Sequence, residues 1–206
     1  MEVKLLSHSP LEVADIAICK CYSNKPHIED SKRISRINKV ANVSKHASVI
    51  EHLVYSFDID GISRACLQEL ARHRIASYTV KSSRYTLQEL KDEKNFKLFR
   101  EKANKYVVLT NNEAVNVAII GALENLRVCI IDINGEDRIP NDIAKYCMPE
   151  AYKTSLVMTI NARALQNFLT LRTSKHALWE IQLLAKSMYD VLPESHKVLF
   201  NHCIKD

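Results

Sequence analysis

The sequence predicts an α+β fold, in which helices flank a central, mostly antiparallel sheet and dominate the C-terminal part of the chain. Three observations support this prediction. The chain has 206 residues, 47% of them hydrophobic and 26% charged, which suits a globular protein with one sizeable domain or two small ones. Short β-rich runs indicate strands, and apolar residues at helical spacing fill the C-terminal part. A single domain over residues 1–206 is the organisation we expect.

In the first part of the chain, strands and helices are expected to alternate. Apolar residues spaced i, i+4 and i+8 predict a helix that runs into Arg72, where cations suit the negative end of the helix dipole. The expected elements are an edge strand at Met1–Leu6, helices at Pro10–Cys21 and Ser31–Val43 (the second with a basic outer face), a half-alternating strand at Leu53–Ile59 and the helix marked by Ile62, Cys66 and Leu70.

The second part of the chain begins with a highly charged segment, Lys91–Arg100, which we expect to be exposed. Asn134–Asp137 resembles a short linker. The remaining expected elements are a helix at Asn112–Leu126, a buried strand at Leu156–Ile160, and helices at Asn161–Leu171 and Lys175–Leu192, the last with an apolar stripe of Ala177, Ile181, Leu184 and Met188.

Several classes of protein are excluded by composition. No apolar run approaches the ~18 to 20 residues that cross a membrane, and the first residues lack the apolar core of an export signal. A cytoplasmic enzyme is therefore expected, with no membrane partner. The six cysteines form no CxxC pair, so reduced thiols are expected rather than disulfides or a zinc site.

Glycine is scarce, since only Gly61, Gly121 and Gly135 occur. None lies in a dinucleotide-binding fingerprint or a P-loop. Any phosphate must therefore be bound mainly by side chains and helix ends. The net charge of +5 fits an enzyme that binds anions and also a weak nucleic-acid binder, and charge alone does not separate the two.

A concentration of donors begins at Arg72-His73-Arg74 and ends at Arg84. Guanidinium groups offer planar forks of N–H donors, and hydroxyl groups fill the remaining acceptor sites of a phosphate or carboxylate. The hydroxyl groups come from Ser77, Thr79, Ser82 and Ser83. On composition alone, a solvated basic turn after a helix is favoured over an anion site as the explanation of this segment.

The spacing of this segment resembles the signature of the flavin-dependent thymidylate synthases, Arg-His-Arg followed by seven residues and Ser, here Arg72 to Ser82. His46–His52 is similar to an upstream block of that family. Asn161–Arg172, continued by His176–Ile181, is similar to a second signature. The resemblance runs from about residue 43 to residue 190 with the order of the blocks preserved.

This resemblance implies an activity, cofactors and an assembly. Members of the family make dTMP from dUMP, take the carbon from 5,10-methylenetetrahydrofolate, and use FAD, reduced by NADPH, as the hydride carrier. They are homotetramers whose active sites contain residues from more than one subunit. By the same resemblance, the protein has no nucleic acid as a partner.

The resemblance also implies roles for individual residues. Arg172 matches the arginine that binds the uracil ring and favours ionisation at N3, a role that suits a fixed cation beside an N–H acid. The residues matching FAD contacts are His46, Ser48, Glu51, Arg72, His73, Arg74, Asn161, Arg163 and Asn167. The residues matching nucleotide contacts are Glu69, Arg72, Val80, Lys81, Ser82, Ser83, Arg84, Lys145 and Arg172.

Three positions depart from the family pattern. Glu69 stands where the family usually has Gln, and a carboxylate is unexpected beside a phosphate-bearing ligand. Lys145 replaces an Arg from a neighbouring subunit, which keeps the charge and loses the bidentate fork. Val80 occupies a position that is often Glu or Gln, so only its backbone can contribute.

The residues alone leave other interpretations open. Arg163, Gln166, Asn167 and Thr170 form a polar stripe opposite Leu165, Phe168 and Leu169, and such a stripe is often only a solvated helix face. A core or capping role for Glu51 and His52 is the main alternative to a ligand site at His46–His52, and no metal is expected there. The competing functions are a basic nucleic-acid-binding module and a flavoprotein that transfers no carbon.

No cysteine stands in the Pro-Cys-His setting used by the conventional thymidylate synthase, because Cys147 is followed by Met148-Pro149. Nucleophilic activation by a cysteine is therefore not expected. Ser82 has no evident general base beside it and is interpreted as a nucleotide ligand.

Overall fold

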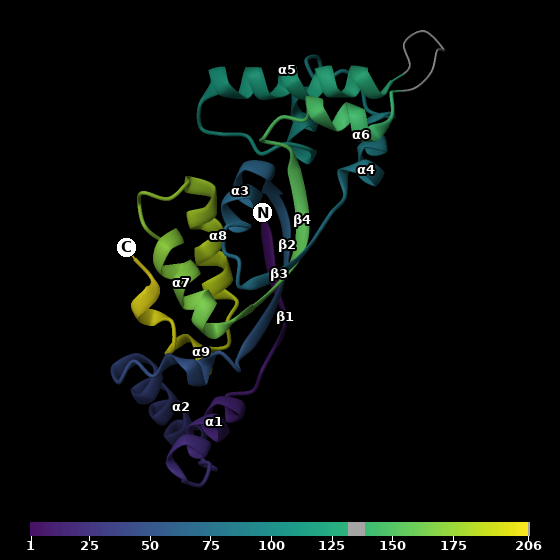
Figure 1. Ribbon diagram of the computed structural model, residues 1–206. Coiled ribbons are helices and arrows are strands. Elements are labelled where there is room, and N and C mark those ends of the chain that lie inside the picture. The colour runs from purple at the N-terminus through teal and green to yellow at the C-terminus, as the bar shows by residue number, and fades with distance from the viewer. Residues whose placement is uncertain (132–138, 206) are drawn as a thin grey trace. The chain divides into compact units, whose positions relative to one another are not determined.

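The computed structural model describes residues 1–131 and 139–205, and the linker predicted at Asn134–Asp137 lies outside them. Its one named sheet has four strands in the order β1-β2-β4-β3 (Figure 1), namely β1 (Glu2–His8), β2 (Val54–Ser63), β4 (Lys153–Asn161) and β3 (Ala76–Val80). Together with its helices, this sheet confirms the predicted α+β class, with β1 at an edge as expected. That residues 1–206 form a single domain stays a prediction.

Strand β2 shows why alternating sequence becomes a half-buried strand. It pairs antiparallel with β1, with Val3 opposite Ile59 and Leu5 opposite Phe57. Tyr55, Phe57 and Ile59 are fully buried, while the residues between them are more exposed. Side chains alternate between the two faces of a strand, so this pattern directs one face into the core.

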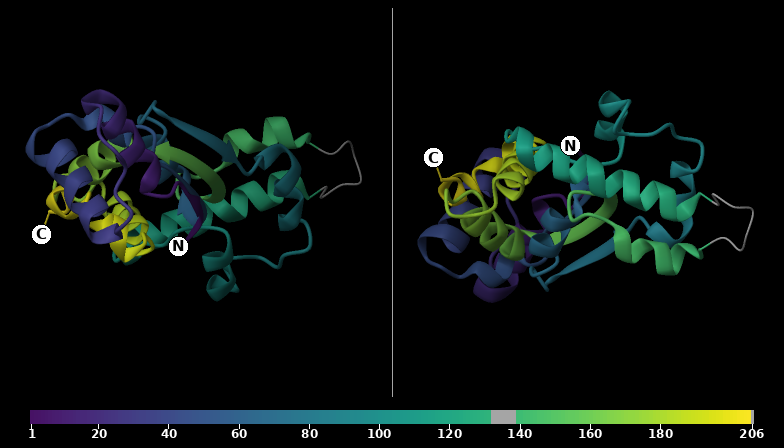
Figure 2. Two further views of the ribbon diagram at one scale, coloured as in Figure 1. Left: turned by 90° about the horizontal axis from the view of Figure 1, so that it is seen from below. Right: turned by 90° about the horizontal axis from the view of Figure 1, so that it is seen from above.

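The chain divides into two compact units. Unit 1 comprises Met1–Asp60, Glu69–Thr79 and Leu156–Asp206, and unit 2 comprises Gly61–Gln68 and Val80–Ser155. Residues from both ends of the sequence therefore belong to unit 1, and Figure 2 draws these two ends in purple and yellow.

Unit 1 contains α1 (Glu12–Tyr22), α2 (Asp30–Asn38), α7 (Ala162–Arg172), α8 (Trp179–Asp190) and α9 (Glu194–Lys197). Helix α7 buries Leu165, Phe168 and Leu169 completely, as its apolar spacing predicts. Burying one such side chain contributes about 1.5–3 kcal/mol. This contribution fixes the rotation of α7, and hence the direction of its polar face.

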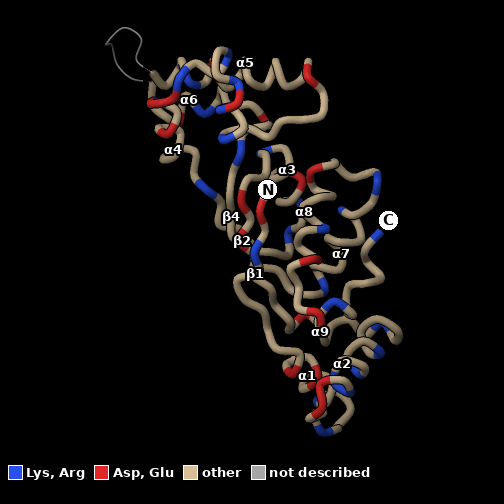
Figure 3. Tube along the Cα trace, turned by 180° about the vertical axis from the view of Figure 1, so that it is seen from behind, with Lys and Arg blue, Asp and Glu red and all other residues tan. Residues whose placement is uncertain are grey.

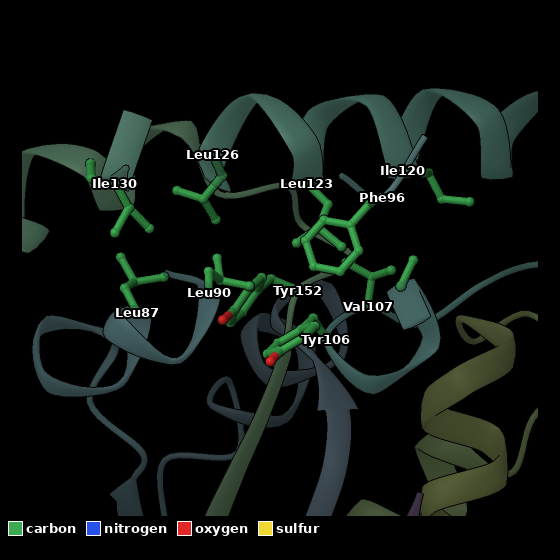
Figure 4. Close-up of a cluster of buried hydrophobic side chains, with 12 residues drawn as sticks. Leu87, Leu90, Phe96, Tyr106, Val107, Ile120, Leu123, Leu126, Ile130 and Tyr152 are labelled. Atoms are coloured by element: carbon green, nitrogen blue, oxygen red, sulfur yellow. The ribbon is translucent and has the colours of Figure 1, made fainter. Parts of the chain in front are cut away.

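Unit 2 contains α4 (Ser83–Thr86), α5 (Glu113–Ile130) and α6 (Asn141–Ala144), and α3 (Arg64–Leu70) begins in it. The side chain of Asn112 caps α5 by accepting a hydrogen bond from the Val115 amide at 3.1 Å. Figure 4 shows apolar side chains of α5 facing others from the preceding segment, among them Leu87, Leu90, Phe96, Tyr106, Val107, Ile120, Leu123, Leu126 and Ile130. Residues between 96 and 130 thus contribute to the apolar core of unit 2.

The structure corrects five details of the predicted elements. Ile62 belongs to β2 rather than to α3, and α3 ends at Leu70 before Arg72. Helix α8 begins at Trp179, because residues 173–178 form turns, so Ala177 is not part of its apolar stripe. Strand β3 was not predicted. Phe96 is fully buried within the charged segment that was expected to be exposed.

The second predicted helix is α2 followed by a π-helical turn, Lys39–Val43. Lys and Arg recur along it (Figure 3), but only part of this set faces solvent. Lys32 and Lys39 are exposed, whereas Arg36 lies 3.2 Å from the fully buried carboxylate of Asp15. One cation of the predicted basic face, Arg36, is therefore taken up by an ion pair with a buried carboxylate.

Candidate functional site

A pocket of about 990 Å³ lies within unit 1 and contains most of the residues expected to bind FAD. This volume is at the upper end of the ~300–1,000 Å³ typical of ligand sites. The expected residues that line the pocket are Glu51, Arg72, His73, Arg74, Asn161, Arg163, Asn167 and Arg172. Residues far apart in the sequence are thus brought together at this pocket, from the turn after α3 and from α7.

Several cations at this pocket have no counter-ion among the residues that the structure describes. The side chains of Arg74, Arg163 and Lys205 make no ion pair or hydrogen bond with any residue in 1–131 or 139–205. Glu51 is the only carboxylate among the lining residues that the structure describes. An excess of unpaired guanidinium and ammonium groups makes the pocket suited to a ligand with several oxyanions.

Arg172, at the last position of α7, is held differently from these free cations. Its Nε donates to Nε2 of His73 at 2.9 Å, its Nη1 donates to Oε2 of Glu69 at 2.8 Å, and its Nη2 donates to the carbonyl oxygen of Glu69 at 3.0 Å. Its side chain is 16% exposed. Since a guanidinium group has five N–H donors, two remain for a ligand.

His73 is kept neutral in this arrangement. Burial, together with the neighbouring Arg172 and Arg72 cations, lowers the pKa of His73 to about 4, although Glu69 opposes this shift. The ring packs edge-on against Phe168 of α7, with centroids 5.0 Å apart. A neutral imidazole accepts a hydrogen bond through one nitrogen, so His73 acts here as an acceptor that orients Arg172.

The polar stripe predicted from the sequence lies on helix α7. Asn161 is its N-cap, and the Asn161 side chain accepts a hydrogen bond from the Ala164 amide at 2.8 Å. Arg163 and Asn167 are exposed at the pocket one helical turn apart. Gln166 also lines the pocket but is 4% exposed, and its amide donates to the carbonyl oxygen of Leu199 at 2.7 Å. Arg163 and Asn167 of this stripe therefore form part of the pocket wall, whereas Gln166 is buried and hydrogen-bonds to the chain at Leu199.

The C-terminal segment forms a wall of the pocket that was missed in the sequence. His202, Cys203 and Lys205 line it. The Thr173 hydroxyl donates to the carbonyl oxygen of Leu169 and lies 3.3 Å from that of Cys203, and it accepts from the Lys205 amide at 3.1 Å. These bonds hold the segment along α7. His176 was also missed as a lining residue, although it belongs to the second signature.

The block at residues 46–52 contributes less to the pocket than the turn after α3. His46 precedes a 3₁₀ turn at Ala47–Ile50, and both His46 and Ser48 are exposed outside the lining set. Glu51 lines the pocket, and Glu51 and His52 are both exposed, so neither has a core role. Their predicted contacts with FAD stay predictions.

The remaining predicted nucleotide residues belong to unit 2. Val80, Lys81, Ser82 and Arg84 are exposed, and Ser83 begins α4. Helices α4 and α6 are in contact, with the Asn141 amide donating to the carbonyl oxygen of Arg84 at 2.7 Å. Lys145 directly follows α6. Unit 2 therefore places the Ser82–Arg84 segment and the residues leading into Lys145 in one local cluster.

The cysteines are free thiols within the described ranges. Cys203 is the one cysteine among the pocket-lining residues there, and burial raises the pKa of its thiol despite the nearby Arg163 and Lys45. In residues 1–131 and 139–205, no group of His, Cys, Asp or Glu could hold a metal ion. No helix in the same ranges is long and apolar enough to cross a membrane.

The chain is similar to one family of known proteins along most of its length. The family model for the thymidylate synthase complementing protein matches residues 4–196. The flavin-dependent thymidylate synthase of Wolinella succinogenes is 55% identical over 97% of both chains, and that of Campylobacter jejuni is 51% identical over 99% of this chain and 98% of its own.

Similarity to a solved structure extends over the whole chain. The crystal structure of thymidylate synthase X from Helicobacter pylori, with FAD and dUMP, has a TM-score of 0.93 and 48% sequence identity, with full coverage of both chains. A match of this length, together with the ordered motifs and the pocket, shows that the chain belongs to the family of flavin-dependent thymidylate synthases.

Proposed function

We propose that this protein synthesises dTMP by reductive methylation of dUMP, with FAD as its cofactor. The observation that carries this proposal is the pocket in unit 1, where unpaired cations surround a large volume and Arg172 keeps two free donors. The family membership supports the same activity, and it leaves the alternative of a basic nucleic-acid-binding module without support.

The residues present fit FAD. Its pyrophosphate requires donors that are not already neutralised by the protein, and Arg74 and Arg163 meet this condition. Asn161 and Asn167 add amide groups for the polar edges of the flavin or of its sugar and base. Bound FAD supplies the hydride-transfer chemistry that amino-acid side chains lack.

Arg172 binds and polarises the pyrimidine ring in this proposal. A cation held beside the uracil N3–H lowers the pKa of that group and stabilises negative charge on the ring. The bonds to His73 and Glu69 hold the guanidinium in place, so little reorganisation is needed when charge develops.

A cysteine nucleophile is not part of the proposed mechanism. Cys203 is the pocket-lining thiol within the described residues, and its raised pKa keeps it protonated at neutral pH. Activation of the ring is therefore assigned to Arg172 rather than to covalent addition.

The cluster in unit 2 is assigned to the phosphate of dUMP. Ser82, Ser83 and Arg84 offer hydroxyl and guanidinium donors, and Lys145 adds a point charge. We propose that the enzyme is a cytoplasmic homotetramer, with each active site built from more than one subunit. Methylenetetrahydrofolate is the proposed carbon donor, and NADPH is the proposed reductant of the flavin.

The proposal is tested by the spectrum and products of the purified protein. Flavin absorbance, or uptake of added FAD, is expected first. The protein should then form dTMP from dUMP, methylenetetrahydrofolate and NADPH, and activity should depend on FAD. A colourless protein that takes up no FAD contradicts the proposal. A protein that reduces FAD with NADPH but forms no dTMP is instead a flavoprotein that transfers no carbon.

A further inference from the structure

The residue that carries a further inference is Glu69, whose side chain is 33% exposed on the last turn of α3. It was expected to contact the nucleotide, although a carboxylate is poorly suited to a phosphate-bearing ligand. In the structure, both its carboxylate and its carbonyl oxygen bind Arg172. A carboxylate occupied in this way is directed at a protein cation rather than at a nucleotide anion.

We propose that Glu69 is a positioning residue for Arg172, which it holds through a two-point contact that leaves two guanidinium N–H groups directed at the uracil ring. The inference rests on the proposed function, because it assigns Arg172 to that ring. It differs from the direct nucleotide contact that the resemblance implies for residue 69.

Three acceptors from one turn of the chain define the orientation of Arg172. Oε2 of Glu69 accepts from Nη1 at 2.8 Å, its carbonyl oxygen accepts from Nη2 at 3.0 Å, and Nε2 of His73 accepts from Nε at 2.9 Å. A planar guanidinium group that is hydrogen-bonded through three of its five N–H donors is fixed in both position and orientation. The remaining donor on each Nη is available to a ligand at the pocket.

The carboxylate also supplies the counter-charge of a mostly buried cation. Arg172 is 16% exposed, and no other carboxylate lies within ion-pair distance of it among residues 1–131 and 139–205. Arg72 lies 3.7 Å from the other carboxylate oxygen of Glu69, but its side chain is 74% exposed and is free to move away. The stronger interaction of Glu69 is therefore with Arg172.

Three variants distinguish a positioning role of Glu69 from direct contact of Glu69 with the nucleotide. Glu69→Gln removes the negative charge but keeps a side-chain oxygen that can accept from Nη1. Glu69→Ala removes the charge and the side-chain acceptor, and both variants keep the backbone carbonyl oxygen that accepts from Nη2. Gln68→Ala is the matched control, because Gln68 precedes Glu69 on α3 and its amide donates to the carboxylate of Glu150 instead.

Affinity for dUMP is measured on the FAD-loaded enzyme, in the wild-type background and in an Arg172→Lys background. We expect loss of orientation to outweigh the gain from freeing the Arg172 charge, because the uracil ring of free dUMP is uncharged at neutral pH. Glu69→Ala is expected to weaken dUMP binding about tenfold, and Glu69→Gln about threefold, in the wild-type background. Gln68→Ala should not change it.

In the Arg172→Lys background, the Glu69 variants are expected to change dUMP affinity less than about twofold, since residues that act through one another are not additive. An equal loss in both backgrounds, or tighter binding by Glu69→Gln, overturns the inference in favour of direct contact. Unchanged affinity of Glu69→Ala in the wild-type background overturns it as well.

A second measurement needs no nucleotide. The ¹⁵N resonance of the Arg172 Nη1 group, which donates to the Glu69 carboxylate and is assigned by its loss in Arg172→Lys, should show slow hydrogen exchange in the wild-type enzyme. Exchange should become faster in Glu69→Ala and stay slow in Gln68→Ala. Exchange that is equally slow in Glu69→Ala overturns the inference. A wild-type enzyme that binds neither FAD nor dUMP contradicts the proposed function, whereas slow exchange with normal dUMP binding in Glu69→Ala contradicts positioning alone.

Discussion

At the scale of single residues, burial and hydrogen bonding decide which ionisable groups of unit 1 carry charge. The His73 ring is neutral and serves Arg172, and a second histidine, His196, is neutral for a structural reason. His196 is 3% exposed, and its Nδ1 lies 2.8 Å from the hydroxyl of the fully buried Tyr55. Burial, with a smaller effect of His8, lowers the pKa of His196 to about 4.

The lowered pKa of His196 makes stability depend on pH. Above pH 6.5 the imidazole is neutral in both the folded and unfolded states, so it contributes no pH dependence. Between pH 6.5 and about 4 the unfolded chain takes up a proton that the folded chain does not, and the free energy of unfolding falls by up to ~1.4 kcal/mol per pH unit for this group.

We therefore expect His196→Gln to flatten the fall of unfolding free energy between pH 6.5 and 4, as measured by denaturant titration. His27→Gln serves as the control for loss of a histidine outside this core. Equal slopes for His196→Gln and the wild-type protein would show that His196 does not carry this pH dependence.

At the scale of elements, helix α7 combines a structural cap with a ligand-binding face. The Asn161 side chain satisfies the Ala164 amide and also lines the pocket, so the two roles can be separated by substitution. Asp caps a helix as well as Asn does but adds a negative charge to the proposed FAD site.

Asn161→Asp is expected to keep the melting temperature and lose FAD affinity, because the cap survives and a negative charge is added to the pocket. Asn161→Ala is expected to lose about 1 kcal/mol of stability along with FAD affinity. Thermal melting of the FAD-free protein and fluorescence titration with FAD measure the two effects. Unchanged FAD affinity of Asn161→Asp would show that Asn161 does not contact FAD.

The C-terminal segment is the second element with a testable role. Lys205 lines the pocket, and its backbone is held by Thr173. Lys205→Glu is expected to weaken FAD binding about fivefold, since reversal of an exposed charge changes binding by ~1 kcal/mol. Lys186→Glu, which alters an exposed lysine of α8 away from the lining set, is the control. An equal effect of both variants would indicate only a general change in net charge.

At the scale of the whole molecule, the predicted ligand residues belong to both compact units: Arg172 and the FAD residues to unit 1, and the Ser82–Arg84 segment and Lys145 to unit 2. In the proposed tetramer, complete active sites draw these groups from different subunits. That arrangement predicts complementation between two inactive variants.

Arg84→Ala and Arg172→Ala are each expected to be inactive by themselves. After the two proteins are mixed, unfolded and refolded together, part of the dTMP-forming activity should return, because some sites receive both intact residues. Each variant refolded alone is the control. Absence of recovery, with mixed tetramers demonstrated by a tag on one variant, would place both residues in the same subunit's site.

The sequence by itself determined the helices with strong apolar spacing, the alternating strand around Phe57, and the order of the motifs that contain Arg72, Asn161 and Arg172. These features depend on residues within one or two turns of each other, so periodicity and spacing record them. Strand β3 and the burial of Phe96 were not predictable in this way, because a partner strand and a core of other residues decide them.

Only the tertiary structure decided which groups hold Arg172 and which residues form the C-terminal wall of the pocket. Glu69 is 103 residues from Arg172 in the sequence, and His73 is 99 residues from it. The C-terminal wall likewise depends on the bonds of Thr173 to residues about 30 positions later. Hydrogen-bond partners at such separations are brought together by the tertiary packing of unit 1, which no local sequence pattern contains.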